Sequence, residues 1–175
     1  QQSDADLLYR FVRVEQLLQM IYQLPMTSVA LVQGRCFGAA ADIVASCRKR
    51  IAAPDASFRM PGLQFDIVLG TRRLARLIGT DAAFDLLETS RIFSADDALA
   101  VGFLTDIRPA EDWASHIDKL AIDAGKLSDD AKTALLAATR DDRGLDHDLA
   151  ALVRSAATPG LAERIRAFVA TQVKK

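Results

Sequence analysis

The stretch that decides the fold of this chain is VALVQGRCFGAAADIVASC, residues Val29–Cys47. It opens with apolar, partly β-branched residues that predict a short buried strand, and a turn containing Gly34 and Gly38 follows. Small residues then predict a helix. The first N–H groups of a helix have no partner within it, and the helix dipole is positive at that end. The junction can therefore hold an anion or an oxyanion.

The length and composition of the chain exclude several classes of protein. With 175 residues, 50% of them hydrophobic, the chain can bury a core and is one domain or a large part of one. Its formal charge of −1 indicates no basic face, so we expect no nucleic-acid partner. No apolar run approaches the roughly 18 residues of a membrane span, so we expect no membrane association.

Cysteine usage predicts neither a disulfide framework nor a metal site. Cys36 and Cys47 are too few for such a framework, which favours a reducing, cytoplasmic location. Their separation matches no metal-ligand spacing, and no histidine lies near Cys36 in sequence to activate its thiol.

Periodicity and capping signals predict strands early in the chain and helices late. Ser3 and Asp6 form a capping-box pattern before a first helix, which Pro25 ends. A second capping box at Ser94 opens a short helix, and Thr80 or Asp81 is expected to cap the helix before it. Strands are expected at 28–32 and 50–53, with a strand or extended connector at 103–107. The other helices are expected at 39–47, 72–78, 80–89, 113–124, 129–139, 146–156 and 161–173.

Read in order, these motifs resemble the enoyl-CoA hydratase/isomerase family, also called the crotonase family. Its members typically follow a strand and a glycine-containing turn with three glycines, any residue, and a glutamate that opens a helix. The corresponding run here is Gly38–Asp42, GAAAD. The family's Pro–Glu element resembles Phe58–Phe65, FRMPGLQF, and is followed by Gly70–Leu74, GTRRL, and Ser94–Gly102, SADDALAVG. The series covers roughly residues 5 to 107.

The resemblance implies an α/β fold, a right-handed crotonase-like ββα spiral followed by a helical C-terminal region. We expect residues 1–107 to form the C-terminal part of the spiral core. Residues 108–175 are expected to form a helical oligomerisation region, because family members usually associate as trimers or as hexamers made of two trimers. Gln1 is not an initiator Met and the chain runs directly into a helix, so we expect a preceding segment with earlier strands.

The resemblance also implies an enzyme that binds an acyl-CoA thioester and stabilises its enolate with two backbone N–H donors. Gly38 and Ala39 would form one half of this oxyanion hole, with the Ala39 N–H as donor. The second donor would lie in the preceding segment. Coenzyme A enters as part of the substrate, so no separate cofactor is expected. Three further residues are expected to bind substrate: Phe37, Gly62 and Leu63.

The acid–base groups depart from the family pattern. A hydratase of the family generally uses two glutamates, whereas an isomerase can work with one. Asp42 stands at the first glutamate position and Gly62 at the second, so two-glutamate hydration is not expected. Asp66 follows in the same loop and can supply a second carboxylate, which makes Asp42 and Asp66 the candidate catalytic residues. The alternatives are a first-turn aspartate stabilised by the helix dipole and a solvated turn aspartate, respectively.

Two functions remain open from the sequence. The first is an acyl-CoA enzyme that performs double-bond isomerisation, atypical hydration, thioester hydrolysis or decarboxylation of a malonyl-type thioester. The second is a catalytically impaired family member that binds acyl-CoA without hydratase activity. Arg72 and Arg73, at a helix start, either meet a CoA phosphate or pair with an acid.

Overall fold

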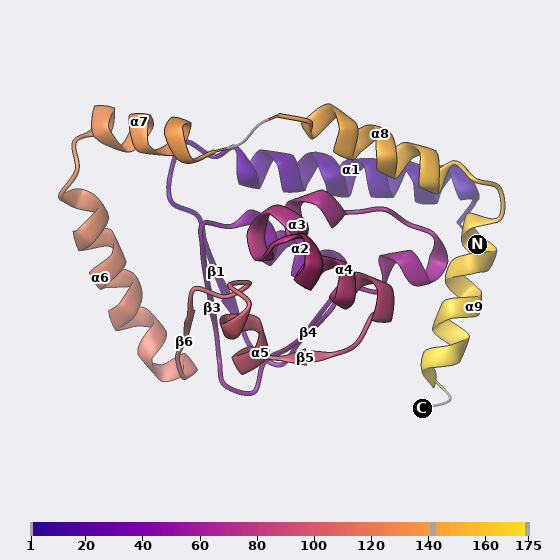
Figure 1. Cartoon of the computed structure of the whole chain (residues 1–175), viewed down its shortest axis with the longest axis horizontal. Helices are drawn as coiled ribbons and strands as arrows, with labels where there is room; N and C mark the ends of the chain where they lie inside the picture. The colour runs from indigo at the N-terminus through magenta and orange to yellow at the C-terminus, as the bar shows by residue number, and fades with distance from the viewer. Residues whose placement is uncertain (1, 141–142, 174–175) are drawn as a thin grey trace.

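Two successive strand–strand–helix turns form the centre of the fold in the computed structural model, which describes residues 2–140 and 143–173 (Figure 1). The first turn consists of β1 (Val29–Val32), β2 (Arg35–Phe37) and α2 (Ala39–Ser46). The second turn consists of β3 (Lys49–Ala52), β4 (Ser57–Arg59) and, after the 3-10 helix η1 (Gly62–Phe65), α3 (Thr71–Ile78). The predicted ββα spiral is confirmed.

Strands from the two turns pair with each other and give the spiral its two sheets. β1 pairs with β3 in parallel, and β3 pairs in parallel with β6 (Asp106–Ile107). β2 pairs with β4 in parallel, and β4 pairs in antiparallel fashion with β5 (Phe93–Ser94). In the predicted segment 103–107, the residues of β6 pair as a strand, whereas Phe103 and Leu104 before it lie buried in the core.

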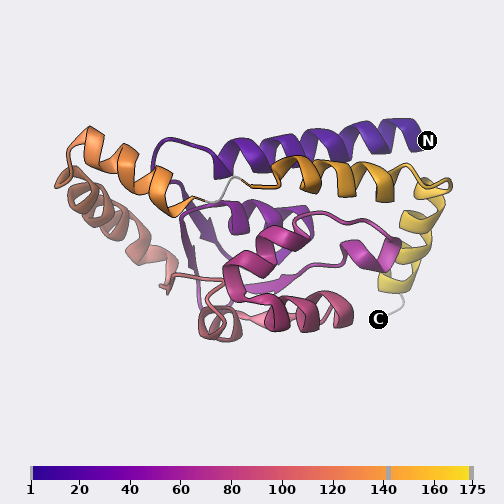
Figure 2. The same cartoon turned by 45° about the horizontal axis from the view of Figure 1, so that its top comes forward.

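Helices enclose the spiral, and α1 (Asp4–Tyr22) runs along α8 (Leu145–Ala156) although the two are far apart in sequence (Figure 1 and Figure 2). The helices α6 (Trp113–Gly125) and α7 (Asp129–Thr139) extend from the spiral on the side opposite α9 (Leu161–Val173) (Figure 1). No helix formed by the described residues has both the length and the apolar character needed to cross a membrane. The remaining helices are α4 (Thr80–Thr89), α5 (Ala95–Ala100) and η2 (Ala110–Asp112).

The two predicted capping boxes are confirmed, but the cap of α4 is not the one expected. Ser3 caps α1 and Ser94 caps α5, each accepting a hydrogen bond from the backbone N–H three residues later. The residue that caps α4 is Gly79, instead of Thr80 or Asp81. The reason is that α3 ends at the same glycine. Gly79, with a φ of +87°, is the single residue between the two helices, so no polar residue stands there to cap α4 with its side chain.

Asp4 fastens the start of α1 to the start of α9. Its carboxylate accepts hydrogen bonds from the N–H groups of Gly160 at 2.8 Å, Leu161 at 3.2 Å and Ala162 at 2.8 Å. These donors are the unpaired N–H groups at a helix N-terminus, which favour a negative charge. They lower the pKa of Asp4, because each bond stabilises the ionised carboxylate.

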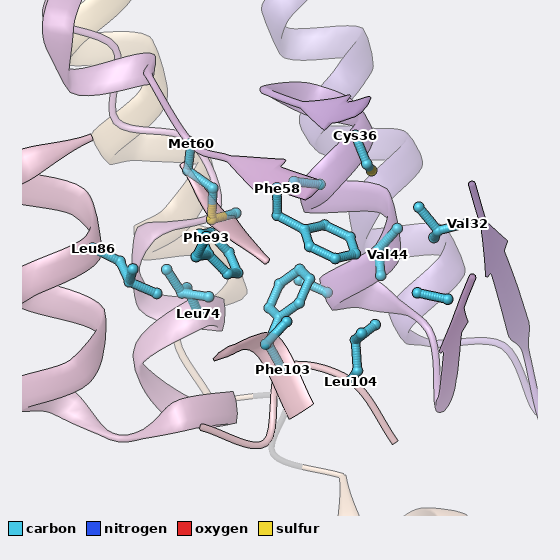
Figure 3. Close-up of a cluster of buried hydrophobic side chains, with 14 of the residues drawn as sticks. Val32, Cys36, Val44, Phe58, Met60, Leu74, Leu86, Phe93, Phe103 and Leu104 are labelled. Carbon is cyan, nitrogen blue, oxygen red and sulfur yellow. The ribbon is translucent and has the colours of Figure 1, made fainter. Parts of the chain in front are cut away.

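The main core lies between the sheets and the helices α2 to α5, and three aromatic rings stand at its centre (Figure 3). Phe58, Phe93 and Phe103 are almost fully buried, and their ring centroids lie 5.2 to 5.6 Å apart. Such distances allow offset and edge-to-face packing of the rings. A second cluster around Ile67 and Leu152 joins η1 and the loop after it to the helices α1, α8 and α9.

Arg50 ties β3 to the connection before β6 from inside the protein. It is 8% exposed, and its Nε donates to the Phe103 carbonyl at 2.6 Å. Its Nη1 donates to the carbonyls of Cys47 at 2.9 Å and Arg48 at 3.2 Å. Burial lowers the pKa of Arg50, and the carbonyl oxygens offset that penalty in place of a carboxylate.

We expect Arg50→Met to lower the free energy of unfolding by about 2 to 4 kcal/mol, because it strips charged hydrogen bonds from buried carbonyls. Denaturant titration measures the change. Arg35→Met, at an exposed position of β2, is the matched control and should change stability by less than about 0.5 kcal/mol. Equal effects of the two substitutions would contradict the structural role given to Arg50.

Candidate active site

A small cavity of about 50 Å³ lies where α2 begins. Most of the residues predicted for the substrate site line this cavity: Gly38, Ala39 and Asp42 from the start of α2, and Gly62 and Leu63 from η1. The other walls are apolar except for Thr71, and they include Phe11, Met60, Phe65 and Leu87. Apolar walls with a few polar groups are typical of sites for small organic ligands.

The start of α2 has a backbone N–H without a partner in the helix at Ala39, a residue that lines this cavity. Gly38 has a φ of +61°, a conformation that glycine adopts freely, and it turns the chain from β2 into α2. Its own N–H donates to the carbonyl of Arg59 at 2.8 Å and is therefore engaged. Ala39 is the first residue of α2, where an N–H has no carbonyl within the helix to bond. The role of the Ala39 N–H as an oxyanion donor stays a prediction.

Asp42 lies one helical turn after Ala39 and is buried, with 4% of its surface exposed. No described residue bonds to its Oδ1, and that oxygen fills the space that a Cβ on Gly70 would take. Burial raises the pKa of Asp42 to about 8, with Arg73 opposing the rise and Glu15 adding to it. The carboxyl is therefore mostly protonated at pH 7, unlike an exposed aspartate.

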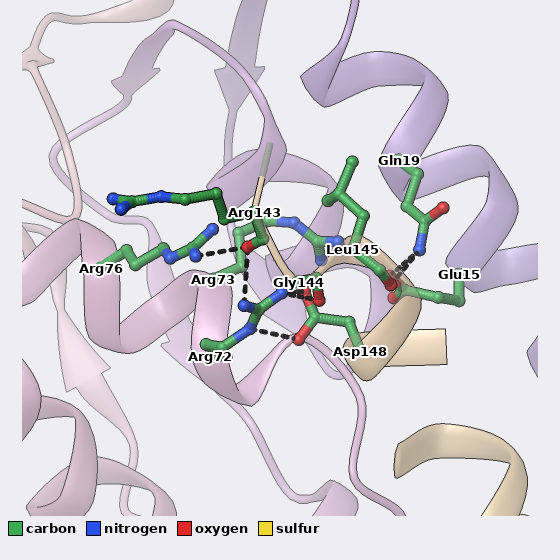
Figure 4. Close-up of polar contacts among 9 residues, drawn as sticks. All are labelled: Glu15, Gln19, Arg72, Arg73, Arg76, Arg143, Gly144, Leu145 and Asp148. Carbon is green, nitrogen blue, oxygen red and sulfur yellow. Dashed lines mark hydrogen bonds and ion pairs between the residues drawn. The ribbon is translucent and has the colours of Figure 1, made fainter. Parts of the chain in front are cut away.

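A buried ion pair, both members of which act on Asp42 by charge, joins α3 to α1 (Figure 4). The Nη2 of Arg73 lies 3.0 Å from Glu15 Oε1, and the two side chains are 5% and 1% exposed. The neighbouring Arg72 pairs with Asp148 at 2.7 Å. Of the two interpretations given to these arginines from the sequence, pairing with acids is the one observed.

The backbone around Gly62 explains why the second family carboxylate is missing. Gly62 opens η1, and its carbonyl accepts a hydrogen bond from the Ile67 N–H at 2.9 Å. A Cβ placed on Gly62 would lie 2.9 Å from the Ile67 carbonyl oxygen, closer than side chains normally approach a backbone atom. This tight turn excludes any side chain at position 62, so a carboxylate there would require the loop to move.

Asp66 and Phe37 do not lie among the residues that line the cavity. Asp66 ends η1 with a φ of +60°, its side chain is 73% exposed, and Arg164 lies 3.4 Å away. Phe37 ends β2 and pairs with Arg59 of β4. The structure therefore brings Asp42 together with the predicted oxyanion donor and does not bring Asp66 to the same place.

Sequence reasoning missed Glu15, although a signal for it existed. Glu15 follows Phe11 by four residues and precedes Leu18 by three, so it falls within the apolar stripe of the first helix. A carboxylate on a buried helix face needs a buried partner. In the described part of the chain, no His, Cys, Asp and Glu side chains gather into a group that could hold a metal ion.

The wall of the cavity formed by Phe65 is held in place by α9. The rings of Phe65 and Phe168 lie 5.1 Å apart, and Arg164 Nε donates to the Phe65 carbonyl at 3.2 Å. The guanidinium of Arg59 lies over the Phe168 ring, with its central carbon 5.8 Å from the ring centroid. The end of the chain thus supports one side of the cavity.

The spiral and its cavity match a known group of proteins over most of the chain. A family model described as enoyl-CoA hydratase/isomerase matches residues 4–154. The chain belongs to the enoyl-CoA hydratase/isomerase family. The matched region includes every residue of the cavity and both members of the Glu15–Arg73 pair.

Three members or neighbours of the enoyl-CoA hydratase/isomerase family show the extent of the similarity. The "Probable enoyl-CoA hydratase" of Bacillus subtilis (strain 168) is 31% identical over 126 residues, which cover 70% of this chain and 48% of that protein. A Bordetella parapertussis protein assigned to the enoyl-CoA hydratase/isomerase class is 46% identical with a TM-score of 0.93, covering 97% of this chain and 70% of the other. A methylmalonyl-CoA decarboxylase is 20% identical with a TM-score of 0.74, covering 90% and 65%, and shares the fold. The chain spans about half the length of the Bacillus subtilis relative.

The raised pKa of Asp42 predicts a specific dependence of stability on pH. Between its ordinary value of 3.8 and about 8, the folded protein holds a proton that the unfolded chain releases. Folding stability from this group is therefore complete below pH 3.8 and is lost as the pH rises to about 8. Asp42→Asn removes the titration, so the stability of the variant relative to wild type should rise across this window.

Urea unfolding of both proteins at a series of pH values measures this difference. Asp96→Asn on the exposed surface of α5 is the control, and the change with pH for Asp42→Asn should exceed the change for this control. A flat difference for Asp42→Asn would show that the carboxyl is not held protonated in the folded protein.

We expect Gly70→Ala to destabilise the protein by about 2 to 4 kcal/mol, because the new methyl group overlaps Asp42 Oδ1 and φ is +65°. Gly34→Ala is the matched control, since Gly34 has a φ of +63° and no atom near its Cβ position. This control should lower the free energy of unfolding by about 1 kcal/mol, the cost of placing alanine at a positive φ. Combining Gly70→Ala with Asp42→Ala should remove the excess; an excess that persists would locate the clash elsewhere.

Proposed function

We propose that this protein acts on acyl-CoA thioesters, stabilises a thioester enolate at the start of α2, and uses Asp42 as its acid–base group. One observation carries the proposal: the Ala39 N–H and the buried Asp42 carboxyl line the same apolar cavity, one helical turn apart. Membership in the enoyl-CoA hydratase/isomerase family supports the substrate class. A backbone donor that meets a developing oxyanion contributes on the order of 3 kcal/mol to transition-state stabilisation.

A single carboxyl favours proton transfer over the addition of water. The turn at Gly62 leaves no room for a second carboxylate, and Asp66 lies outside the cavity lining. One carboxylate suffices to move a double bond. Asp42 takes a proton from the α-carbon of a 3-enoyl thioester, and the C–H electrons pass to the thioester oxygen. The enolate then collapses, its γ-carbon takes the same proton, and a conjugated 2-enoyl thioester results.

The pKa of Asp42 suits this task. A value of about 8 makes the carboxylate a much stronger base than an ordinary aspartate. About a tenth of the protein still carries the ionised form at pH 7, because the pKa lies roughly one unit above that pH. Acid–base groups work best when their pKa lies near the operating pH, since the correct charge state and sufficient proton affinity are then both available.

Two further expectations from the sequence are not tested by the described residues. The second oxyanion donor predicted upstream of Gln1 stays a prediction, as does assembly into trimers or hexamers through the C-terminal helices. Because this chain spans about half the length of its Bacillus subtilis relative, the activity of the whole protein is part of the proposal.

The proposal is tested with a panel of 2-enoyl-, 3-enoyl- and malonyl-type CoA thioesters, monitored through the absorbance of the conjugated thioester and by chromatography of products. We expect conversion of a 3-enoyl-CoA, and Asp42→Asn should lower kcat by about a hundredfold or more while CoA binding persists. Asp96→Asn is the matched control on the surface.

Three outcomes are informative. Binding without turnover on the whole panel would support the alternative, a catalytically impaired acyl-CoA-binding member of the family. Full activity in Asp42→Asn would remove Asp42 from the mechanism. A loss in Asp66→Asn that equals the loss in Asp42→Asn would show that the exposed carboxylate takes part as well.

A further inference from the structure

Three buried titratable side chains from three helices interact by charge in the interior of the protein. Glu15 of α1, Arg73 of α3 and Asp42 of α2 are 1%, 5% and 4% exposed. Each has an atom that no described residue bonds: Glu15 Oε2, Arg73 Nη1 and Asp42 Oδ1. Two carboxyls and one guanidinium in so dry a place carry a net negative charge unless one carboxyl holds a proton.

The contacts decide which carboxyl is ionised. Glu15 Oε1 accepts from Arg73 Nη2 at 3.0 Å and from Gln19 Nε2 at 3.0 Å (Figure 4). The same Gln19 nitrogen donates to the Leu145 carbonyl at 3.1 Å, which fixes the position of the amide. Two donors on one oxygen favour the carboxylate form of Glu15. Asp42 Oδ1 has no such donor in the described structure, so the proton belongs on Asp42.

The other charged and titratable groups around α2 do not offer Asp42 a second counter-ion. On β2, burial and Asp42 raise the pKa of the Cys36 thiol to about 11, so that thiol is neutral. On α3, Arg72 is bonded to Asp148, and Arg76 Nη2 donates to the Arg143 carbonyl at 2.6 Å. The groups that act on Asp42 by charge are Arg73 and Glu15.

We infer that Glu15 is a positioning residue of this site: by binding the Arg73 guanidinium, it competes with Asp42 for the one counter-ion that both carboxyls share, which favours a proton on Asp42. The charge assignment stands on the contacts, and only its effect on turnover rests on the proposed function. The raised pKa of Asp42, to which Glu15 contributes, agrees with it.

Carboxyl carbon NMR titration tests the assignment in the wild-type protein labelled in Asp and Glu. The resonances are assigned by their absence in Asp42→Asn and Glu15→Gln. We expect Asp42 to be protonated and Glu15 ionised at neutral pH. The opposite assignment, or two ionised carboxyls, would overturn the inference without any need for the Glu15 variants to be stable over the full pH range.

Glu15→Gln then isolates the effect of the charge. The substitution keeps the shape of the side chain and frees Arg73 to act on Asp42, so the midpoint of Asp42 should fall by about one to three pH units. Where the protein turns over 3-enoyl-CoA, the limb of the kcat–pH profile that reports Asp42 should move by the same amount. The plateau rate should fall about tenfold, because a weaker base abstracts the proton.

Two matched variants separate charge from packing. Glu15→Asp keeps the negative charge and should keep the midpoint of Asp42 near its wild-type value. Glu88→Gln, on the exposed surface of α4, should leave both the midpoint and kcat unchanged. An unmoved midpoint in Glu15→Gln, or an equal shift in Glu15→Asp, would overturn the inference. A shifted midpoint together with full activity in Asp42→Asn would support the charge assignment and remove the proposed function instead.

Discussion

The buried ion pair between Arg73 and Glu15 is the interaction on which the arrangement of the site depends. It joins the first helix to the second turn of the spiral, and losing one partner of such a pair costs about 3 to 5 kcal/mol because a charge is left unpaired in the interior. Through Gln19 the same carboxylate is linked to Leu145 at the start of α8. One anion therefore aligns three helices that are far apart in sequence, and Asp42 is buried against them.

Close backbone approaches set the limits of the chemistry. Gly70 has no side chain where Asp42 Oδ1 sits, and Gly62 has none where the Ile67 carbonyl sits. The first approach packs one carboxyl tightly beside a helix N-terminus, and the second excludes another carboxyl from the facing loop. The cavity thus contains one buried carboxyl, Asp42, whose proton affinity is raised by burial and by Glu15 and lowered by Arg73.

Local signals in the sequence predicted most helices and some strands, whereas the spiral arrangement was predicted from the resemblance of the ordered motifs to a family. The strand–turn–helix run of Val29–Cys47 and the capping boxes at Ser3 and Ser94 predict elements that the structure contains, because each depends on neighbouring residues. The cap of α4 was wrong, since it depends on how α3 ends at Gly79. The site was predicted only in part. The residues from Gly38 to Asp42 were predicted from their spacing within one short motif. The pairing of Glu15 with Arg73 arises from tertiary packing, which no local pattern encodes.

The support of Phe65 by the last helix separates the shape of the cavity from the charge state of Asp42. Phe168 and Arg164 hold a cavity wall from a part of the chain that lies far in sequence from Asp42. Substitutions in α9 can therefore reshape the cavity while Asp42 and its charged neighbours are unchanged. The two properties can thus evolve independently.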